Sequence, residues 1–550
     1  MAINDTRESV QRIVDELFAQ GILTAHVEAT LERPKSREHG DYATNVALVA
    51  AKSSSLPPRE LAHQIAERLS ADPAFTDVSV AGPGFVNIRL SAQTQGEIAE
   101  RVVHLGSGFG RNDALLGKSF NVEFISANPT GPLHLGHTRW AAVGDALARV
   151  LAAAGADVTT EFYINDRGVQ MDKFGASVMA AASGEAVPED GYHGGYILDL
   201  AAQINREHPE FRQLPAEEQL VAFREEAYAL QWQQQKDVLE LFRTHFDVWY
   251  SERKLYDSGA VERAQARLEE QGHVFESEGA LWLRTTTFGD DKDRVLIKEN
   301  GERTYFAADT AYYVDKRMRG FDTAIYLLGA DHHGYVNRLR AVAACAGDDM
   351  DENIEILIGQ MVKITRGGVE VKLSKRSGQI VTLEELVEEV GVDAARYTLA
   401  RYPVETPLVV DLEEIARKAN DNPVFYVQYA HARISSVLRN AEDIGAKWRE
   451  SEFIPELLNS DQENELLGVI EKFPAVIATA AELREPHRVA RFLEELASAY
   501  HGFYDACRVL PRSDEELGSV HIARLWVCAA TQQTLANGLE LLGVSAREKM

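Results

Sequence analysis

The chain has 550 residues, of which 45% are hydrophobic and 26% charged, so it is long enough for several domains and typical of a globular protein. Its formal net charge of −28 argues against a generally nucleic-acid-binding surface, because a phosphate backbone favours a basic partner, but net charge does not exclude local basic clusters such as 363–376. There is no apolar run of membrane-span length, no signal peptide at MAINDTRESV and no CxxC pair among three cysteines, so we expect a cytoplasmic protein without disulfides or a zinc ribbon.

Residues 1–110 are expected to form a small α+β module with an exposed loop at 34–42. Apolar spacing marks its elements, which are helices at 9–18 and 59–69 and strands at 78–80 and 85–90, on either side of a Gly-Pro-Gly turn. A structural cap explains this pattern as well as a binding module does.

The stretch 121–171 is predicted to be a strand–helix–strand unit. An apolar run at 122–125 and a Pro/Gly-containing loop precede a helix at 138–154, and a second apolar run follows at 158–164. Such a unit makes parallel strands through a right-handed crossover, and its first loop opens at the carboxyl end of a strand, where α/β sheets bind ligands.

A polar, helical stretch at about 172–290, with an amphipathic helix at 230–246, is interpreted as an insertion that carries no chemistry. The sheet is predicted to resume after it. Its expected elements are strands at 295–298, 304–306, 323–328 and 354–358, helices at 309–318 and up to 346, and a hairpin at 363–374. Residues 111–378 therefore read as a Rossmann-type parallel-sheet domain split by an insertion, with its ligand at the crevice of the sheet.

From 382 to 550 the apolar spacing is helical throughout. We expect a connecting helical segment at 379–420 and an all-α bundle at 421–550, with Pro423 starting or kinking a long helix. The predicted fold class is multidomain α/β, with an N-terminal α+β module and a C-terminal all-α bundle on either side of the Rossmann-type domain.

His134 and His137 are predicted to lie at a helix start, where free backbone N–H groups and the helix dipole favour anions. Imidazole donors there could stabilise charge on a phosphate. The alternatives are a chance HxGH or a metal pair, and the lack of a nearby cysteine or HExxH spacing argues against metal.

Lys372 and Lys375, in the sequence KLSKR, form a second candidate cluster. Two ammonium groups three residues apart can neutralise charge on the leaving group of a triphosphate. The alternative is a solvated basic turn. The two motifs, in this order on two halves of one fold, reinforce each other.

HLGH and KLSKR resemble the HIGH and KMSKS signatures of class I aminoacyl-tRNA synthetases. The flanks SANPTGPLHLGH and DNPVFYVQYAHAR and the ending LLGV resemble the arginyl-tRNA synthetase family in particular, and the likeness runs from SREHGDYATNVAL to the C-terminus. Some members of that family lack the second lysine of the KMSKS-type loop, whereas this chain keeps Lys375.

The resemblance implies an enzyme, an arginine–tRNA ligase that activates L-arginine with ATP to arginyl-adenylate, releases pyrophosphate and transfers arginine to the terminal ribose of tRNA(Arg). It also implies that tRNA is needed even for the activation step, that Mg²⁺ bridges phosphate oxygens, and that no structural metal is bound. The implied catalytic and nucleotide-binding residues are His134, Gly136, His137, Lys372, Ser374 and Lys375.

The resemblance further implies an amino-acid site. Ser126 and Asn128 would bind the α-amino or carboxylate end, with His137 nearby. Tyr305 and Asp309 match a Tyr-x-x-x-Asp pattern whose carboxylate faces the guanidinium, a group best met by a carboxylate. Two further assignments are Glu123, a weaker second carboxylate that could equally be a strand-edge surface charge, and His332, where many members have Gln.

For tRNA, the N-terminal module resembles the domain that grips the tRNA elbow, and Asn87 is the candidate base-reading residue. The C-terminal bundle resembles an anticodon-binding module, in which Tyr426, Tyr429 and Arg433 are candidate contacts. The alternative is that the tyrosines belong to the helix core. The expected partners are tRNA(Arg), arginine and ATP, with no membrane, and we expect a monomer.

Two other functions compete with this interpretation. One is another nucleotidyl-transferring enzyme of the HIGH type, which uses a different amino acid or no tRNA at all; an enzyme without tRNA would not need the all-α C-terminal half. A non-catalytic tRNA-binding paralogue would not need intact histidines and lysines in both motifs.

Overall fold

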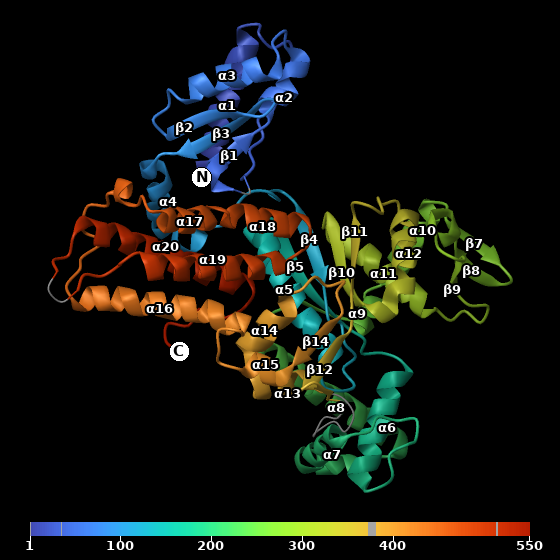
Figure 1. Ribbon diagram of the computed structural model, residues 1–550. Coiled ribbons are helices and arrows are strands. Elements are labelled where there is room, and N and C mark those ends of the chain that lie inside the picture. The colour runs from blue at the N-terminus through green and yellow to red at the C-terminus, as the bar shows by residue number, and fades with distance from the viewer. Residues whose placement is uncertain (1, 35, 372–380, 513–514) are drawn as a thin grey trace.

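The computed structural model describes residues 2–34, 36–371, 381–512 and 515–550 (Figure 1). An N-terminal α+β module, a parallel-sheet domain and an all-α bundle follow one another along the chain. The predicted fold class is therefore confirmed.

The N-terminal module is built on an antiparallel sheet with the strand order β1-β3-β2. Val86, Ile88 and Leu90 of β3 are buried in its core, while Asn87 lies between them on the opposite face of the strand. The elements are α1 (Ala2–Ala19), β1 (Tyr42–Thr44), α2 (Val46–Ala50), α3 (Pro58–Leu69), β2 (Phe75–Ala81) and β3 (Phe85–Leu90).

The central sheet has five strands in the order β11-β10-β4-β5-β6, and every pairing in it is parallel. From β4 the chain continues to β5 and β6 on one side of the sheet, and it later adds β10 and β11 on the other side. The strand order therefore reverses at β4. Loops from both directions diverge at the carboxyl ends of β4 and β10, which leaves a crevice for a ligand. The elements are β4 (Ser119–Glu123), α5 (Leu135–Ala153), β5 (Asp157–Ile164), β6 (Val248–Ser251), α11 (Tyr305–Met318), β10 (Thr323–Gly329), α12 (Val336–Cys345) and β11 (Ile354–Gly359).

The sheet is covered on both faces, as a parallel sheet requires. Ile325 and Leu327 of β10 join the core that contains α5, whereas Tyr326 joins the core that contains α11 and α12. The α5 helix packs directly on the strand ends, because a Cβ at Gly144 would lie 2.3 Å from the Phe124 ring. The two cores hold the carboxyl edge of the sheet between α5 and α11.

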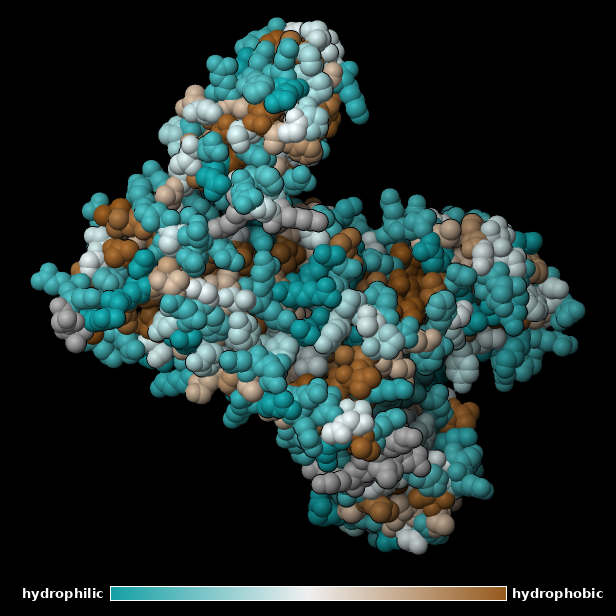
Figure 2. Space-filling view, in the orientation of Figure 1, coloured by the Kyte–Doolittle hydropathy of each residue, from teal (hydrophilic) through white to brown (hydrophobic). Residues whose placement is uncertain are grey.

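The predicted insertion does not lie wholly outside the sheet, because β6 within it forms the edge strand beside β5. The rest forms two lobes on either side of the crevice, and the outline of the molecule is indented between them (Figure 2). The strand predicted at 304–306 is also wrong: the Thr304 side chain accepts from the Ala307 N–H and so caps α11. The lobe elements are α6 (Val169–Ser183), α7 (Gly195–Glu207), α8 (Ala216–Leu241), α9 (Glu252–Asp257), α10 (Ala260–Glu270), β7 (Val274–Ser277), β8 (Ala280–Leu283) and β9 (Arg294–Ile297).

The connecting segment at 379–420 was expected to be helical, but part of it is a strand. Residues 408–411 form β14, which pairs in parallel with β12, and β12 makes the predicted hairpin with β13 around Gly367 and Gly368. The elements are β12 (Val362–Arg366), β13 (Val369–Glu370), α13 (Leu383–Val390), α14 (Val392–Ala400), β14 (Leu408–Asp411) and α15 (Leu412–Ala416).

The C-terminal bundle packs around α19 and α20. Helix α4, which falls within the range predicted for the N-terminal module, lies against α17 and α20 of this bundle. Pro423 occupies the first turn of α16 and starts that helix, where its missing N–H costs nothing. The helices are α4 (Ala92–Leu105), α16 (Pro423–Asp443), α17 (Asp461–Glu471), α18 (Phe473–Glu482), α19 (His487–Ala506) and α20 (Ser519–Leu541).

A buried arginine joins the bundle to the sheet domain. Arg396 of α14 is ion-paired with Asp145 of α5 and donates to the backbone carbonyls of Phe242 at 2.8 Å and Leu542 at 3.0 Å. Removing one partner of a buried ion pair is strongly destabilising. This contact therefore ties the end of the chain to the helix that begins with the two histidines.

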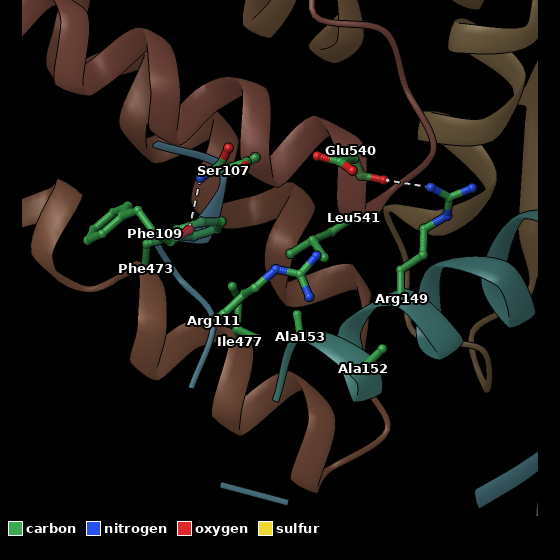
Figure 3. A pocket seen from close by; sticks show the side chains of 11 residues that line it. Ser107, Phe109, Arg111, Arg149, Ala152, Ala153, Phe473, Ile477, Glu540 and Leu541 are labelled. Atoms are coloured by element: carbon green, nitrogen blue, oxygen red, sulfur yellow. Dashed lines mark hydrogen bonds between the residues drawn. The ribbon is translucent and has the colours of Figure 1, made fainter. Parts of the chain in front are cut away.

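The visible face is hydrophilic over most of its area, and its apolar patches are separated from one another (Figure 2). Within the described residues, every helix is too short or too polar to span a bilayer. A cavity of about 240 Å³ lies at the joint of α5, α18 and α20, and the Arg111 side chain extends between the other residues that line it (Figure 3). Ala152 and Ala153 in its wall end α5, so it is a helix length away from His134 and belongs to the domain joint.

Candidate active site

Two histidines frame the first turn of α5. His134 is the N-cap, and its Nδ1 accepts a hydrogen bond from the Gly136 N–H at 3.1 Å. The His137 Nδ1 in turn accepts from the His134 N–H at 3.3 Å, and the ring centroids lie 3.9 Å apart. A Cβ at Gly136 would lie 2.9 Å from His134 Cε1, so the intervening glycine leaves room for the ring. The reciprocal cap holds both rings in place.

The same hydrogen bonds determine where the protons are. Each Nδ1 is an acceptor, so each neutral ring carries its proton on Nε2. Burial lowers the pKa of His134, and burial together with His134 lowers the pKa of His137 to about 3, so both rings are neutral at physiological pH. Two Nε2–H donors at the positive end of a helix suit anionic oxygens.

The second motif lies outside the described residues, which end at 371 and resume at 381; this includes Lys372, Ser374 and Lys375. The chain that resumes there is paired with the histidine turn. The Leu135 N–H donates to the Val381 carbonyl at 3.0 Å, and the Leu383 N–H donates to the Leu133 carbonyl at 2.9 Å. Residues 381–383, where the described chain resumes, are thus hydrogen-bonded to the start of α5.

The turn after β4 is strained, with φ of 71° at Ile125 and 45° at Ser126. The Ser126 hydroxyl donates to Glu123 Oε1 at 2.8 Å and accepts from the Tyr163 N–H at 3.2 Å. These two bonds hold the turn at the end of β4. Glu123 is buried, so the alternative of a surface charge is wrong.

The following loop is held by side chains from the insertion. Gln235 of α8, which is buried, donates to the Asn128 carbonyl at 3.0 Å and to the Gly131 carbonyl at 2.7 Å. The exposed Asn128 side chain donates to Gln170 Oε1 at 2.8 Å. The insertion, interpreted from sequence as free of chemistry, therefore shapes the loop that leads to the histidines.

Tyr305 and Asp309 lie one helical turn apart on α11, on the same face of that helix. The Tyr305 side chain is 68% exposed. Asp309 is partly exposed, and within the described ranges no hydrogen bond or ion pair involves it. Burial, then Glu252 and Glu123, raise the pKa of Asp309 to about 7, and Arg338 opposes this rise.

The other acids near Asp309 have direct partners. Lys316 Nζ lies 2.5 Å from Glu123 Oε2. Burial raises the pKa of the buried Glu252, and its hydrogen bond with Tyr163 and the charge of Arg167 oppose this rise. Asp309 is the acid of this group left without a direct partner among the described residues, so it is the best-placed carboxylate for an incoming cation.

Three of these residues were not found from the sequence. Glu252 lies in the insertion and reaches the site because β6 pairs with β5. Lys316 on α11 and Arg338 on α12 belong to none of the motifs found in the sequence. The predicted His332 is exposed in the segment after β10, with its Nε2 3.4 Å from Asp331 Oδ2. No contact among the described residues joins His332 to Asp309 or Tyr305.

The candidate nucleic-acid residues are far from this edge in the fold. Asn87 is half-buried on the outer face of the N-terminal sheet. Tyr426 and Tyr429 are half-buried on α16, with ring centroids 5.0 and 6.0 Å from that of His501. The Arg433 guanidinium lies 4.0 Å from the centroid of the Tyr504 ring. This aromatic patch combines packing with exposed faces, so both interpretations of the tyrosines stay open.

Comparison with known families divides the chain into three matched regions. Residues 4–90 match the arginyl tRNA synthetase N-terminal domain, 111–436 match the class I (R) tRNA synthetase catalytic domain, and 427–550 match the DALR anticodon binding domain. The catalytic match covers the five-stranded sheet, its insertion and the two motifs.

Whole-chain relatives agree. The arginine–tRNA ligase of Paenarthrobacter aurescens (strain TC1) is 55% identical over 520 residues, 94% of each chain, and that of Frankia alni (strain DSM 45986 / CECT 9034 / ACN14a) is 52% identical over 548 residues, 99% of each. The crystal structure of a putative arginyl-tRNA synthetase from Campylobacter jejuni is 32% identical, with a TM-score of 0.76 over 84% of this chain and all of that one. The Thermus thermophilus arginyl-tRNA synthetase, 23% identical with a TM-score of 0.75 over all of both chains, shares the fold.

Proposed function

The chain belongs to the arginyl-tRNA synthetase family, and from that premise we propose how its residues carry out the family's reaction. It is an enzyme, an arginine–tRNA ligase, which joins arginine to tRNA at the expense of ATP. The observation that carries the proposed site is the carboxyl edge of the central sheet. There α5 presents two neutral imidazole donors and α11 presents Asp309, a carboxylate without a direct partner among the described residues.

In the activation step, the α-carboxylate of arginine attacks the α-phosphorus of ATP and pyrophosphate leaves. Nε2–H of His134 and His137 would donate to phosphate oxygens, and the Gly136 turn would let the nucleotide approach the helix start. Lys372, Ser374 and Lys375 would bind the opposite side of the triphosphate. The pairing of Leu135 with Val381 supports this arrangement, because Val381 follows Lys375 by only six residues and lies against the first turn of α5.

For arginine, Asp309 would face the guanidinium and Tyr305 would lie over it, while Ser126, Asn128 and His137 bound the α-amino and carboxylate end. A planar guanidinium is best met by a carboxylate, and Asp309 is the one whose charge is least compensated. His332 remains a candidate substrate contact only if the segment after β10 moves toward the pocket.

Mg²⁺ would enter with ATP. The described residues contain no group of three or more His, Cys, Asp or Glu that could hold a metal ion, and Mg²⁺ needs no such cage, because it binds chiefly through substrate phosphates. When bound it neutralises charge on the phosphate oxygens. We further propose that the enzyme acts as a monomer in the cytoplasm, with Asn87 at the tRNA elbow and the α16 aromatic patch at the anticodon.

Pyrophosphate exchange tests the function directly. Purified protein with ATP, labelled pyrophosphate and arginine should exchange label, and the exchange should depend on tRNA. Lysine and glutamate serve as competing substrates. Exchange with either of them but not with arginine would overturn the specificity, and no exchange under any condition would favour a non-catalytic tRNA-binding protein.

The pKa of Asp309 predicts how the use of arginine depends on pH. Below about pH 7 the carboxyl takes up a proton and loses its attraction for the guanidinium, which stays charged throughout. We expect kcat/KM for arginine to fall about tenfold per pH unit below pH 7, while the KM for ATP stays flat. An Asp309→Asn variant should lose this dependence; an identical pH profile in that variant would assign the titration to another group.

The α16 patch predicts a moderate effect on tRNA. Tyr429→Leu keeps apolar bulk but removes the ring face, so the KM for tRNA should rise about tenfold if a base stacks there. Tyr429→Phe is the matched control and should behave like the native enzyme. A lower melting temperature with an unchanged KM for tRNA would show that Tyr429 is helix core.

A further inference from the structure

Lys316 lies on the face of α11 that carries the proposed arginine site. Tyr305, Asp309, Tyr312 and Lys316 recur at the spacing of one helix face. The Lys316 side chain is fully buried, which is rare for lysine and requires a partner. None of the proposed catalytic or substrate-binding steps uses it.

The ammonium group lies over a row of registered residues on the central strands. Tyr326 of β10 is paired with Glu123 of β4, and Glu123 is paired with Glu161 of β5. Lys316 Nζ lies 2.5 Å from Glu123 Oε2, 4.0 Å from Glu161 Oε1 and 4.2 Å from the Tyr326 ring centroid. Arg319 makes a bidentate pair with Glu161 at 2.6 and 2.9 Å, so Lys316 is the direct cation of Glu123.

Glu123 also contacts the strained turn at Ser126. Its second oxygen, Oε1, accepts from the Ser126 hydroxyl at 2.8 Å, and that hydroxyl accepts from the Tyr163 N–H. The positive φ of Ser126 costs energy and persists only where surrounding contacts hold it. One carboxylate therefore links the lysine of α11 to the turn that begins the loop of the active site.

We propose that Lys316 is a positioning residue: it holds the Glu123 carboxylate against the Ser126 turn and so fixes one wall of the arginine site. Without the ammonium, a buried carboxylate would lose its cation at the bottom of that wall, at a large cost. The carboxylate would then swing toward solvent or toward the incoming guanidinium, and the turn would lose its anchor. This proposal rests on the proposed arginine site and adds to it a residue that acts through Glu123.

The test is a double-mutant cycle of Lys316→Met, Glu123→Gln and the double variant, measured with tRNA present. Displacing a substrate-binding group can lower the efficiency of an enzyme by up to about 100-fold. Each single change should therefore raise the KM for arginine about 10–100-fold and leave the KM for ATP within about twofold of the native value. The double variant should be no worse than the worse single variant, because both changes break the same contact. Fold changes that multiply, or equal rises for arginine and ATP, would overturn the proposal.

Three controls separate this outcome from other causes. Lys298→Met removes an exposed ion pair with Glu302 and should change nothing. Melting temperatures identify a variant that does not fold. If one single variant fails, the other single variant and the double variant keep the test open, because the double variant leaves neither a buried carboxylate nor a buried ammonium without its partner. Asp309→Asn separates failure of the proposed arginine site from failure of the role assigned to Lys316. If Asp309→Asn leaves the KM for arginine unchanged, the proposed site is wrong. If Asp309→Asn raises that KM strongly while Lys316→Met behaves like the native enzyme, only the role of Lys316 is wrong.

Discussion

Asp309→Asn should raise the KM for arginine by about 10²–10³-fold and leave the KM for ATP nearly unchanged. Asparagine keeps the shape of the side chain but removes the charge that would meet the guanidinium. Truncating one partner of a desolvated charge pair costs about 3–4 kcal/mol, which corresponds to this factor. Because Asp309 has no direct partner among the described residues, the change should not leave another group unpaired.

The matched control for this variant is Asp257→Asn, which alters an exposed carboxylate at the end of α9. Pyrophosphate exchange at saturating ATP and tRNA gives both Michaelis constants in one series. A native KM for arginine in Asp309→Asn would remove this residue from the site. A parallel loss for ATP would point to a general defect of the crevice.

His134→Asn should lower kcat by about 10²–10³-fold, the loss seen when one preorganised donor is removed from a developing charge. Asparagine is a good N-cap, so α5 should keep its start while the Nε2–H donor disappears. His134→Gln is the informative partner, since its amide N–H group reaches the position of Nε2. We expect it to retain most of the activity that the asparagine variant loses.

Single-turnover formation of arginyl-adenylate distinguishes this effect from slow product release. Burial lowers the pKa of His134 below its usual value and the pKa of His137 to about 3, so neither ring should become charged between pH 7 and 8. The rate of the chemical step at saturating arginine should therefore stay flat over that range. Equal losses in the Asn and Gln variants would mean that the donor at Nε2 is not used.

Many helices and two candidate residue pairs could be predicted from short stretches of sequence. The helical spacing of apolar residues predicted after residue 382 is found in α13 and α19, because each helix buries one continuous stripe. The HLGH pair could be found from its place at a helix start, and the Tyr305–Asp309 pair was implied by the family resemblance. The members of each pair lie within a single turn of one helix, so their relative placement needs no tertiary information.

The elements that were predicted wrongly or missed depend on contacts that local spacing does not show. Residues 304–306 read as a strand because of their ring and β-branched side chains, but the capping bond of Thr304 starts a helix there. β14 is a four-residue strand that exists because β12 lies beside it, and β6 joins the sheet across an insertion. Such pairings depend on residues far apart in sequence, so local propensity does not reveal them.

The sequence alone determined which chemical groups the proposed active site contains: two imidazoles at a helix start, the basic KLSKR sequence, and an acid one turn from a tyrosine. Only the tertiary structure decided how their charges balance. Glu123 and Glu252 lie near Asp309 because the ends of β4, β6 and the start of α11 meet at one edge of a parallel sheet, and Lys316 compensates one of them there. Burial makes each of those charges depend on its neighbours, and neighbours across a sheet are set by strand order rather than by chain position.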